Sequence, residues 1–288
     1  MANKRSQPAA GGGASRGGCV RGSRGSGGAG GGGVSKSLGQ YFEQSQQPLQ
    51  ILFFLVPMLI FYEVGTRLWA RTAEGRIIPV EAYARLNRFF DLTGLDSAGW
   101  YLPGLALVVT LIIWHVMTRK AWEINLAVAG GMVLECAALA LPLFVFDQLL
   151  SRMFAGDGGV PGLAGPVMLS ELDWKARLVL SIGAGLYEEL LFRLLFLTLA
   201  HVVLVNMLGA KAPRGMAVAV VLSALAFTMY HDVTVGLSGA TDWRLVIFYM
   251  VFGVYAAGVL LTRGFGIVVG AHAAYDILVL IVLPGLRG

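Results

Sequence analysis

The stretch GLYEELLFRLLF, Gly185–Phe196, places two carboxylates and a guanidinium in an otherwise apolar segment. An ionised side chain at membrane depth costs about 2.5–3.5 kcal/mol on insertion scales. Glu189 and Arg193 are four residues apart, so on a helix they share a face and can pair. Glu188 lies ~100° round the helix and has no partner in its own segment. Either all three charged side chains make polar contacts that hold neighbouring helices together, or Glu188 faces a polar cavity where a reaction takes place.

The composition of the chain predicts an all-α, polytopic membrane bundle. Of its 288 residues, 56% are hydrophobic and 14% are charged, and the mean hydropathy is +0.70. Apolar runs near the ~20 residues of a spanning helix predict about seven transmembrane helices: Leu49–Leu68, Trp100–Met117, Ile124–Leu150, Leu178–Leu208, Met216–Tyr230, Leu245–Leu261 and Ile267–Leu283.

The chain divides by composition into three parts. Residues 1–40 are rich in Gly, Ser and Arg, too polar to bury a core, and are expected to form a disordered basic tail. Residues 41–177 form an N-terminal transmembrane region, in which apolar residues at helical spacing between the charges of 71–99 indicate an interfacial helix. Residues 178–284 form the C-terminal core.

Charge and cysteine content exclude some functions. The formal net charge is +5, but no nucleic-acid motif accompanies it, so the expected partner is the lipid bilayer, not nucleic acid. The two cysteines, Cys19 and Cys136, are not spaced as a metal knuckle and predict no disulfide framework.

Two further residue pairs, each containing a histidine, lie in apolar runs after Arg193. Phe227 and His231 are four residues apart, as are His272 and Asp276, so each pair shares a helix face. A carboxylate beside a histidine fixes its tautomer and raises its basicity. Helix lengths allow both histidines to converge with Glu188, although they do not require it.

Three motifs, in order on successive apolar helices, carry a family resemblance. EELLFR, FTMYH and HAAYD resemble the EExxxR, FxxxH and HxxxN/D motifs of the CAAX-protease and bacteriocin-processing (CPBP) family of intramembrane proteases. The resemblance covers roughly 178–283 and places these residues in the motifs: Glu188, Glu189, Arg193, Phe227, His231, His272 and Asp276. Asp276 stands where many members have Asn.

The resemblance implies a membrane endopeptidase, with a peptide or membrane protein as its substrate. By similarity, Glu188 activates the water, while His231 and His272 hold that water or the developing oxyanion. Asp276 orients His272, Glu189 and Arg193 orient the site, and Phe227 forms a wall.

The metal requirement has two readings. The chain lacks HExxH, and we favour catalysis without a cofactor. If zinc is used, the ligands are expected to be Glu188, His231 and His272.

Two other functions fit the same residues: a non-catalytic scaffold or bacteriocin-immunity protein, and a proton-coupled transporter. Residues outside the motifs have simpler expectations. His115 and His201 are expected to pack between helices, whereas Glu135 and Asp147 are candidates for lining the cavity. A bacterial cell membrane is the expected location.

Overall fold

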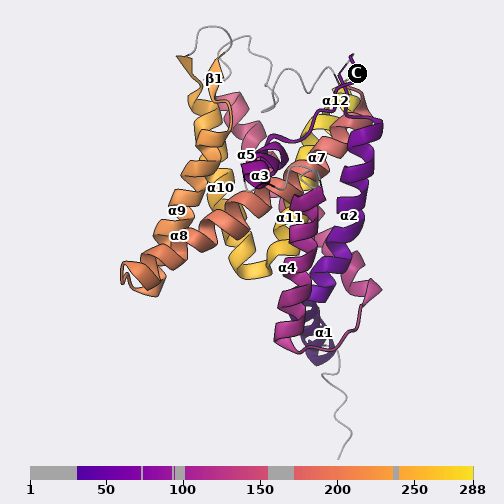
Figure 1. The fold of residues 1–288 in the computed structure, drawn as a ribbon, viewed down its shortest axis with the longest axis vertical. Helices are drawn as coiled ribbons and strands as arrows, with labels where there is room; N and C mark the ends of the chain where they lie inside the picture. Colours follow the sequence, from indigo (N-terminus) through magenta and orange to yellow (C-terminus); the bar gives the residue numbers. More distant parts are fainter. Residues whose placement is uncertain are drawn as a thin grey trace, which may run out of the picture.

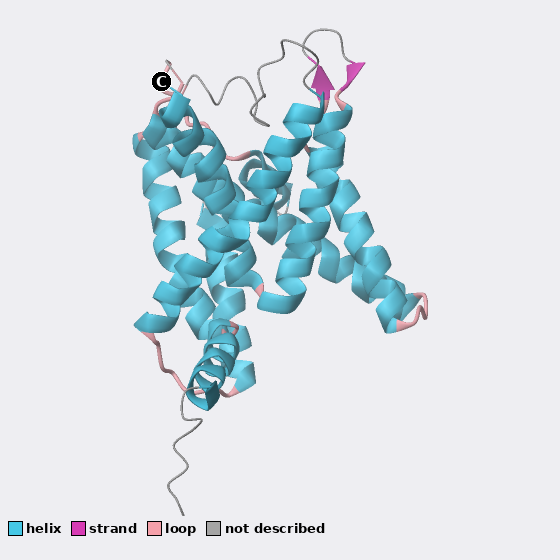
Figure 2. Cartoon of the chain, turned by 180° about the vertical axis from the view of Figure 1, so that it is seen from behind, coloured by secondary structure: helices cyan, strands magenta, loops and turns pink. Residues whose placement is uncertain are grey.

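The computed structural model describes residues 31–72, 74–92, 94, 101–154, 172–235 and 240–287. The described chain is a helical bundle with one pair of two-residue strands at one end (Figures 1 and 2). The strands, β1 (Thr234–Val235) and β2 (Ala240–Thr241), pair antiparallel.

Among the described residues, six helical stretches are long and apolar enough to cross a membrane, which confirms the predicted fold class. They run over Pro48–Leu68, Leu126–Phe154, Trp174–Met207, Ala212–Tyr230, Trp243–Arg263 and Phe265–Leu286. The seventh predicted span corresponds to α4, Leu102–Thr118, which has 17 residues. Its predicted start, Trp100, lies outside the described residues.

The N-terminal part comprises α1 (Gly31–Ser45), α2 (Pro48–Leu68), α3 (Glu81–Leu92), α4 and α5 (Leu126–Phe154). Helix α3 lies in the segment where an interfacial helix was predicted, and its buried residues, Ala82, Tyr83 and Leu86, share one face.

Helix α1 differs from the expectation of a disordered tail up to residue 40, because it begins at Gly31. A physical reason is the set of partners near its end. A Cβ at Gly131 of α5 would meet the Tyr41 ring at 2.7 Å, and the Arg263 guanidinium lies 4.1 Å from the centre of the Phe42 ring. Residues 1–30 of the predicted tail lie outside the described part of the chain.

The C-terminal part begins with α7 (Trp174–Glu189), which continues without a break as a π-helix (Leu190–Leu197), α8 (Thr198–Val202) and a second π-helix (Val203–Met207). Helices α9 (Ala212–Tyr230), α10 (Trp243–Arg263) and α11 (Phe265–Ile277) follow, and α11 continues as a π-helix (Leu278–Val282) and α12 (Leu283–Arg287). Asp242 caps α10, since its carboxylate accepts from the backbone N–H groups of Arg244 and Leu245.

Helix α11 is the central element of the bundle. In the apolar part of the span Phe265–Leu286, which begins with α11, 56% of the residues are buried, compared with 22–33% in the other spans. The reason is that α11 packs between α7 and α5. Gly185 allows α7 to approach closely: a Cβ there would lie 2.7 Å from the Val269 carbonyl oxygen and 2.9 Å from the Ala273 Cβ. Any side chain carried by this part of α11 therefore lies in the interior.

Candidate active site

A cavity of about 400 Å³ lies where α7, α9, α10 and α11 face the chain segment that leads into α3. Five of the residues predicted for the site line it: Glu188, Phe227, His231, His272 and Asp276. The cavity wall is otherwise mostly apolar and aromatic. The structure thus brings together predicted residues from three separate helical segments, which the sequence could place only on their own helices.

His231 is presented to the cavity by the end of α9. The helix ends at Tyr230, and His231 has an extended backbone. Its Nδ1 lies 2.8 Å from the Phe227 carbonyl oxygen. Because a carbonyl oxygen can only accept, Nδ1 is protonated and donates a hydrogen bond to it, and Nε2 faces the cavity. The imidazole stacks on the Tyr249 ring, with centroids 4.0 Å apart. Both contacts hold the ring in one orientation.

His272 is oriented by a carboxylate from another helix. Its Nδ1 lies 2.7 Å from Glu189 Oε1, and the other Glu189 oxygen, Oε2, lies 3.2 Å from Arg193 Nε. The predicted contact within one helix face, from Arg193 to Glu189, is therefore present, and Glu189 also reaches α11. Asp276 lies 3.7 Å from His272 Nε2, beyond hydrogen-bond distance, so the bond that orients His272 comes from Glu189, not from Asp276.

Arg193 and Phe227 pack behind the two histidines. The side chains of Arg193 and Glu189 are fully buried, so neither lines the cavity itself. The Arg193 guanidinium lies 4.2 Å from the centre of the Phe227 ring, and Phe227 in turn lies 4.5 Å from the His231 ring. Phe227 lines the cavity, which matches its expected position as a wall.

The two oxygens of Glu188 have different surroundings. Oε2 lies 3.6 Å from His231 Nε2 and 3.8 Å from His272 Nε2, and among the described residues it is buried without a hydrogen-bond partner. Oε1 lies 3.4 Å from the Tyr230 hydroxyl. Neither Nε2 atom is within hydrogen-bond distance of Oε2, and across such separations a bridging water has to be considered. Glu188 Oε2 and the two Nε2 atoms therefore define one polar position inside an apolar cavity.

Several cavity residues were not predicted from the sequence. Tyr230 and Tyr249 come from α9 and α10, and residues 78–81 come from the N-terminal part. A signal existed for Tyr230, which directly precedes His231 in FTMYH. No local pattern could have indicated residues 78–81, because only the packing of α3 on α7 brings them to the cavity.

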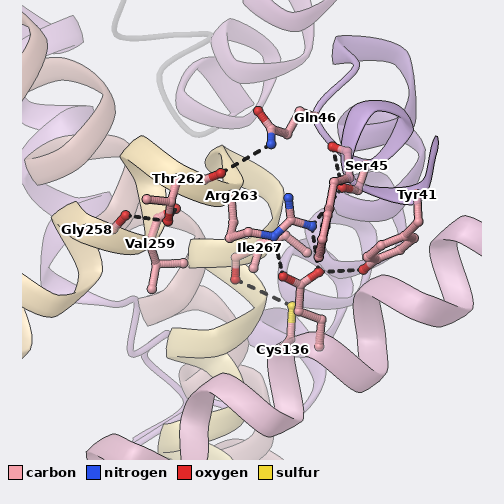
Figure 3. Close-up of polar contacts among 11 residues, drawn as sticks. Tyr41, Ser45, Gln46, Cys136, Gly258, Val259, Thr262, Arg263 and Ile267 are labelled. Atoms are coloured by element: carbon pink, nitrogen blue, oxygen red, sulfur yellow. Dashed lines mark hydrogen bonds and ion pairs between the residues drawn. The ribbon is translucent and has the colours of Figure 1, made fainter. Parts of the chain in front are cut away.

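Glu135, one of the two candidates for the cavity, does not line it. It belongs to a cluster in which Arg263, at the end of α10, faces Tyr41 and Ser45 of α1 (Figure 3). Glu135 Oε2 accepts from the Arg263 guanidinium at 2.9 Å and from the Tyr41 hydroxyl at 2.5 Å. This cluster joins α1, α5 and α10.

Asp147 also lies outside the cavity lining. It is fully buried, with Oδ1 3.8 Å from the Arg244 guanidinium. The two remaining histidines follow their packing expectation. His115 is buried and meets the Trp122 ring edge-on at 4.5 Å, and His201, on α8, is not part of the cavity.

Within the described residues, no group of three or more His, Cys, Asp or Glu side chains is arranged to hold a metal ion. The three expected zinc ligands all face the cavity, but the structure does not set them as such a group. Zinc use stays a prediction for experiment.

Comparison with known proteins gives a family match in the C-terminal part. Residues 171–278 match a family model described as type II CAAX prenyl endopeptidase, Rce1-like. This match confirms the resemblance drawn from the three motifs, all of which fall inside it. Neither the curated proteins nor the solved structures gave a match.

Proposed function

We propose, from the match of residues 171–278 to the Rce1-like endopeptidase family model and from the multi-pass membrane character of the chain, that Glu188 is the base of an intramembrane endopeptidase. The substrate is a peptide bond in a membrane-associated peptide or protein, and the bacterial cell membrane is the proposed location. The observation that carries the proposal is the position of Glu188 Oε2 beside both imidazole Nε2 atoms.

The reaction begins with a water molecule that contacts both Glu188 Oε2 and His231 Nε2 from the cavity side. Since His231 Nδ1 donates to the Phe227 carbonyl oxygen, Nε2 of the neutral ring accepts a hydrogen bond from that water. Glu188 takes a proton as the water oxygen attacks the scissile carbonyl carbon. Proton transfer to a positioned carboxylate supplies the nucleophile that peptide hydrolysis requires.

His272 is proposed to stabilise the tetrahedral oxyanion. Carboxylates of Glu188, Glu189 and Asp276 lie within 3.8 Å of its ring nitrogens and can offset a positive charge there. The doubly protonated ring then donates from Nε2 to the oxyanion. As the C–N bond breaks, Glu188 returns its proton to the leaving amine, and the base is regenerated.

The decisive change is Glu188→Gln, which keeps the shape of the side chain but cannot take a proton. Purified protein in detergent is incubated with a library of apolar peptides, and products are identified by mass spectrometry. We expect hydrolysis by the wild type and a fall of ~10²–10⁴-fold in Glu188→Gln, with an unchanged melting temperature.

Glu135→Gln is the matched control, because Glu135 is also a glutamate in a spanning helix but lies outside the cavity. It should retain activity. Equal hydrolysis by wild type and Glu188→Gln would refute the role of Glu188. A folded wild type that binds these peptides without cleaving them would instead favour the scaffold function.

A further inference from the structure

The hydroxyl group of Tyr230 donates a hydrogen bond to the Glu188 carboxylate, at 3.4 Å from Oε1. Tyr230 is not one of the motif residues, and the mechanism above does not use it. Its hydroxyl contacts the oxygen that faces away from the two histidines. A bond there leaves Oε2 directed at the position where the water is activated.

The ring of Tyr230 is itself held from two sides. On one side it packs against Phe192 of α7's π-helical continuation, with centroids 5.1 Å apart. On the other, the Arg85 guanidinium lies 4.9 Å from the ring centre, within the ~6 Å range of a cation–π contact. Arg85 belongs to α3, which lies outside the segment that matches the family model.

Helix α3 is anchored so that Arg85 stays in place. Arg85 Nε donates to Glu81 Oε1 at 3.1 Å, and Glu81 lines the mouth of the cavity. The Tyr62 hydroxyl accepts from the Val80 N–H at 3.2 Å, and the Tyr83 ring lies 4.9 Å from the Tyr187 ring. Tyr187 directly precedes Glu188 in α7, so α3 is tied to the helix that carries the base.

We propose that Tyr230 is a positioning residue for Glu188, and that α3 acts on the active site by fixing the Tyr230 ring through Arg85. The inference rests on the function proposed above. Without the hydroxyl, the Glu188 carboxylate can rotate, and Oε2 is directed at the water for a smaller fraction of time. The chemical step slows, while substrate binding, which uses the rest of the cavity, is kept.

The test begins with Tyr230→Phe, which keeps the ring and removes the hydroxyl. A hydrogen bond to a charged group contributes about 1.5 kcal/mol at the low end, which suits a 3.4 Å contact and converts to roughly tenfold in rate. We expect kcat to fall by about that factor, with KM and the melting temperature unchanged. A purely structural role would lower the melting temperature and leave kcat of the folded fraction unchanged.

Arg85→Gln tests the second step, with Arg88→Gln as the matched control. Both arginines lie on α3 and pair with Glu81, but only Arg85 has a recorded contact with the Tyr230 ring. We expect Arg85→Gln to lower kcat by roughly two- to fivefold and Arg88→Gln to leave it unchanged. In the Tyr230→Phe background, Arg85→Gln should have little further effect, because its path to Glu188 is already lost.

The outcomes separate the two proposals. Wild-type kcat in Tyr230→Phe, when Glu188→Gln is inactive, overturns the positioning role and leaves the proposed function standing. Equal effects of Arg85→Gln and Arg88→Gln, or full additivity with Tyr230→Phe, overturn the role of α3. Absence of any Glu188-dependent hydrolysis in the wild type overturns both proposals.

Discussion

Glu188 and Glu189 are adjacent residues of one type, and their neighbours give them different positions in the site. Glu188 lines the cavity. Glu189 points into the protein, between Arg193 and His272. A carboxylate that faces the cavity suits a base, whereas a carboxylate held by an ion pair with Arg193 and a hydrogen bond with His272 suits a structural role. The ~100° between successive helical residues is enough to separate the two environments.

The buried pair of Glu189 and Arg193 predicts a specific pattern of stability. Arg193→Ala leaves the Glu189 charge buried beside His272 alone, and breaking a buried pair in this way costs about 3–5 kcal/mol. The double change Glu189→Gln with Arg193→Gln removes both charges. The amide oxygen at residue 189 can still accept a hydrogen bond from His272 Nδ1. We therefore expect the double variant to melt at a higher temperature than Arg193→Ala, as measured by thermal unfolding in detergent. A double variant that is no more stable than Arg193→Ala would show that the two residues do not stabilise each other.

The spacing of side chains predicted the contacts within a helix but not those between helices. Glu189 and Arg193 could be paired because residues four apart share a helix face. The bond from His272 to Glu189 joins residues 83 positions apart in sequence, and it depends on how α7 crosses α11. For the same reason Asp276, which shares a face with His272, was the expected partner, while the shorter contact comes from another helix.

At the scale of the elements, the crossing of α7 and α11 sets the geometry of the site. Gly185 lies one helical turn before Glu188, at a point where backbone atoms of α11 would be 2.7–2.9 Å from a Cβ. Backbone cannot move aside as a flexible side chain can. The distance between the base and His272 therefore depends on the absence of a side chain at residue 185.

Gly185→Ala should consequently separate the two helices. Overpacking costs about 1–3 kcal/mol, and displacing catalytic groups by ~1 Å can lower the rate by ~10²-fold. We expect a lower melting temperature and a large loss of kcat. Gly258→Ala is the control, since a Cβ on that residue of α10 would meet nothing within 4 Å and alanine favours helix. If Gly185→Ala and Gly258→Ala have the same melting temperature and kcat, the close crossing does not determine the site.

Apolar runs predicted the spanning helices to within a few residues, since length and hydropathy alone decide which segments cross a bilayer. They did not predict the π-helical stretch Leu190–Leu197 that follows the two glutamates, because π-helical hydrogen bonding has no compositional signal. Nor did composition predict α1, whose Gly-rich start resembles a linker and whose end is ordered by contacts with α5 and α10.

In the whole molecule, helices outside the family match complete the core that holds the site. Tyr62 of α2 occupies the space beside Gly183 of α7, where a Cβ would collide with its ring. The Sγ atom of Cys136, on α5, lies 3.5 Å from the Ile267 carbonyl oxygen of α11. Helices α2 and α5, which carry none of the three motifs, thereby pack against α7 and α11. The motifs led to the proposed chemistry, and the contribution of the N-terminal part becomes visible only in the packing.

The whole chain also makes the metal question testable by a simple count. It contains four histidines, and two of them, His231 and His272, line the cavity together with Glu188, so zinc bound at this cavity should depend on His231. We expect purified protein to contain less than stoichiometric zinc, activity to survive exhaustive chelation, and His231→Ala to be strongly impaired without any loss of metal. His201→Ala, which changes a histidine outside the cavity, should behave as wild type. Stoichiometric zinc that is absent from His231→Ala, together with activity restored to stripped wild type only by added zinc, would make His231, His272 and Glu188 ligands and give the activation of water to the metal.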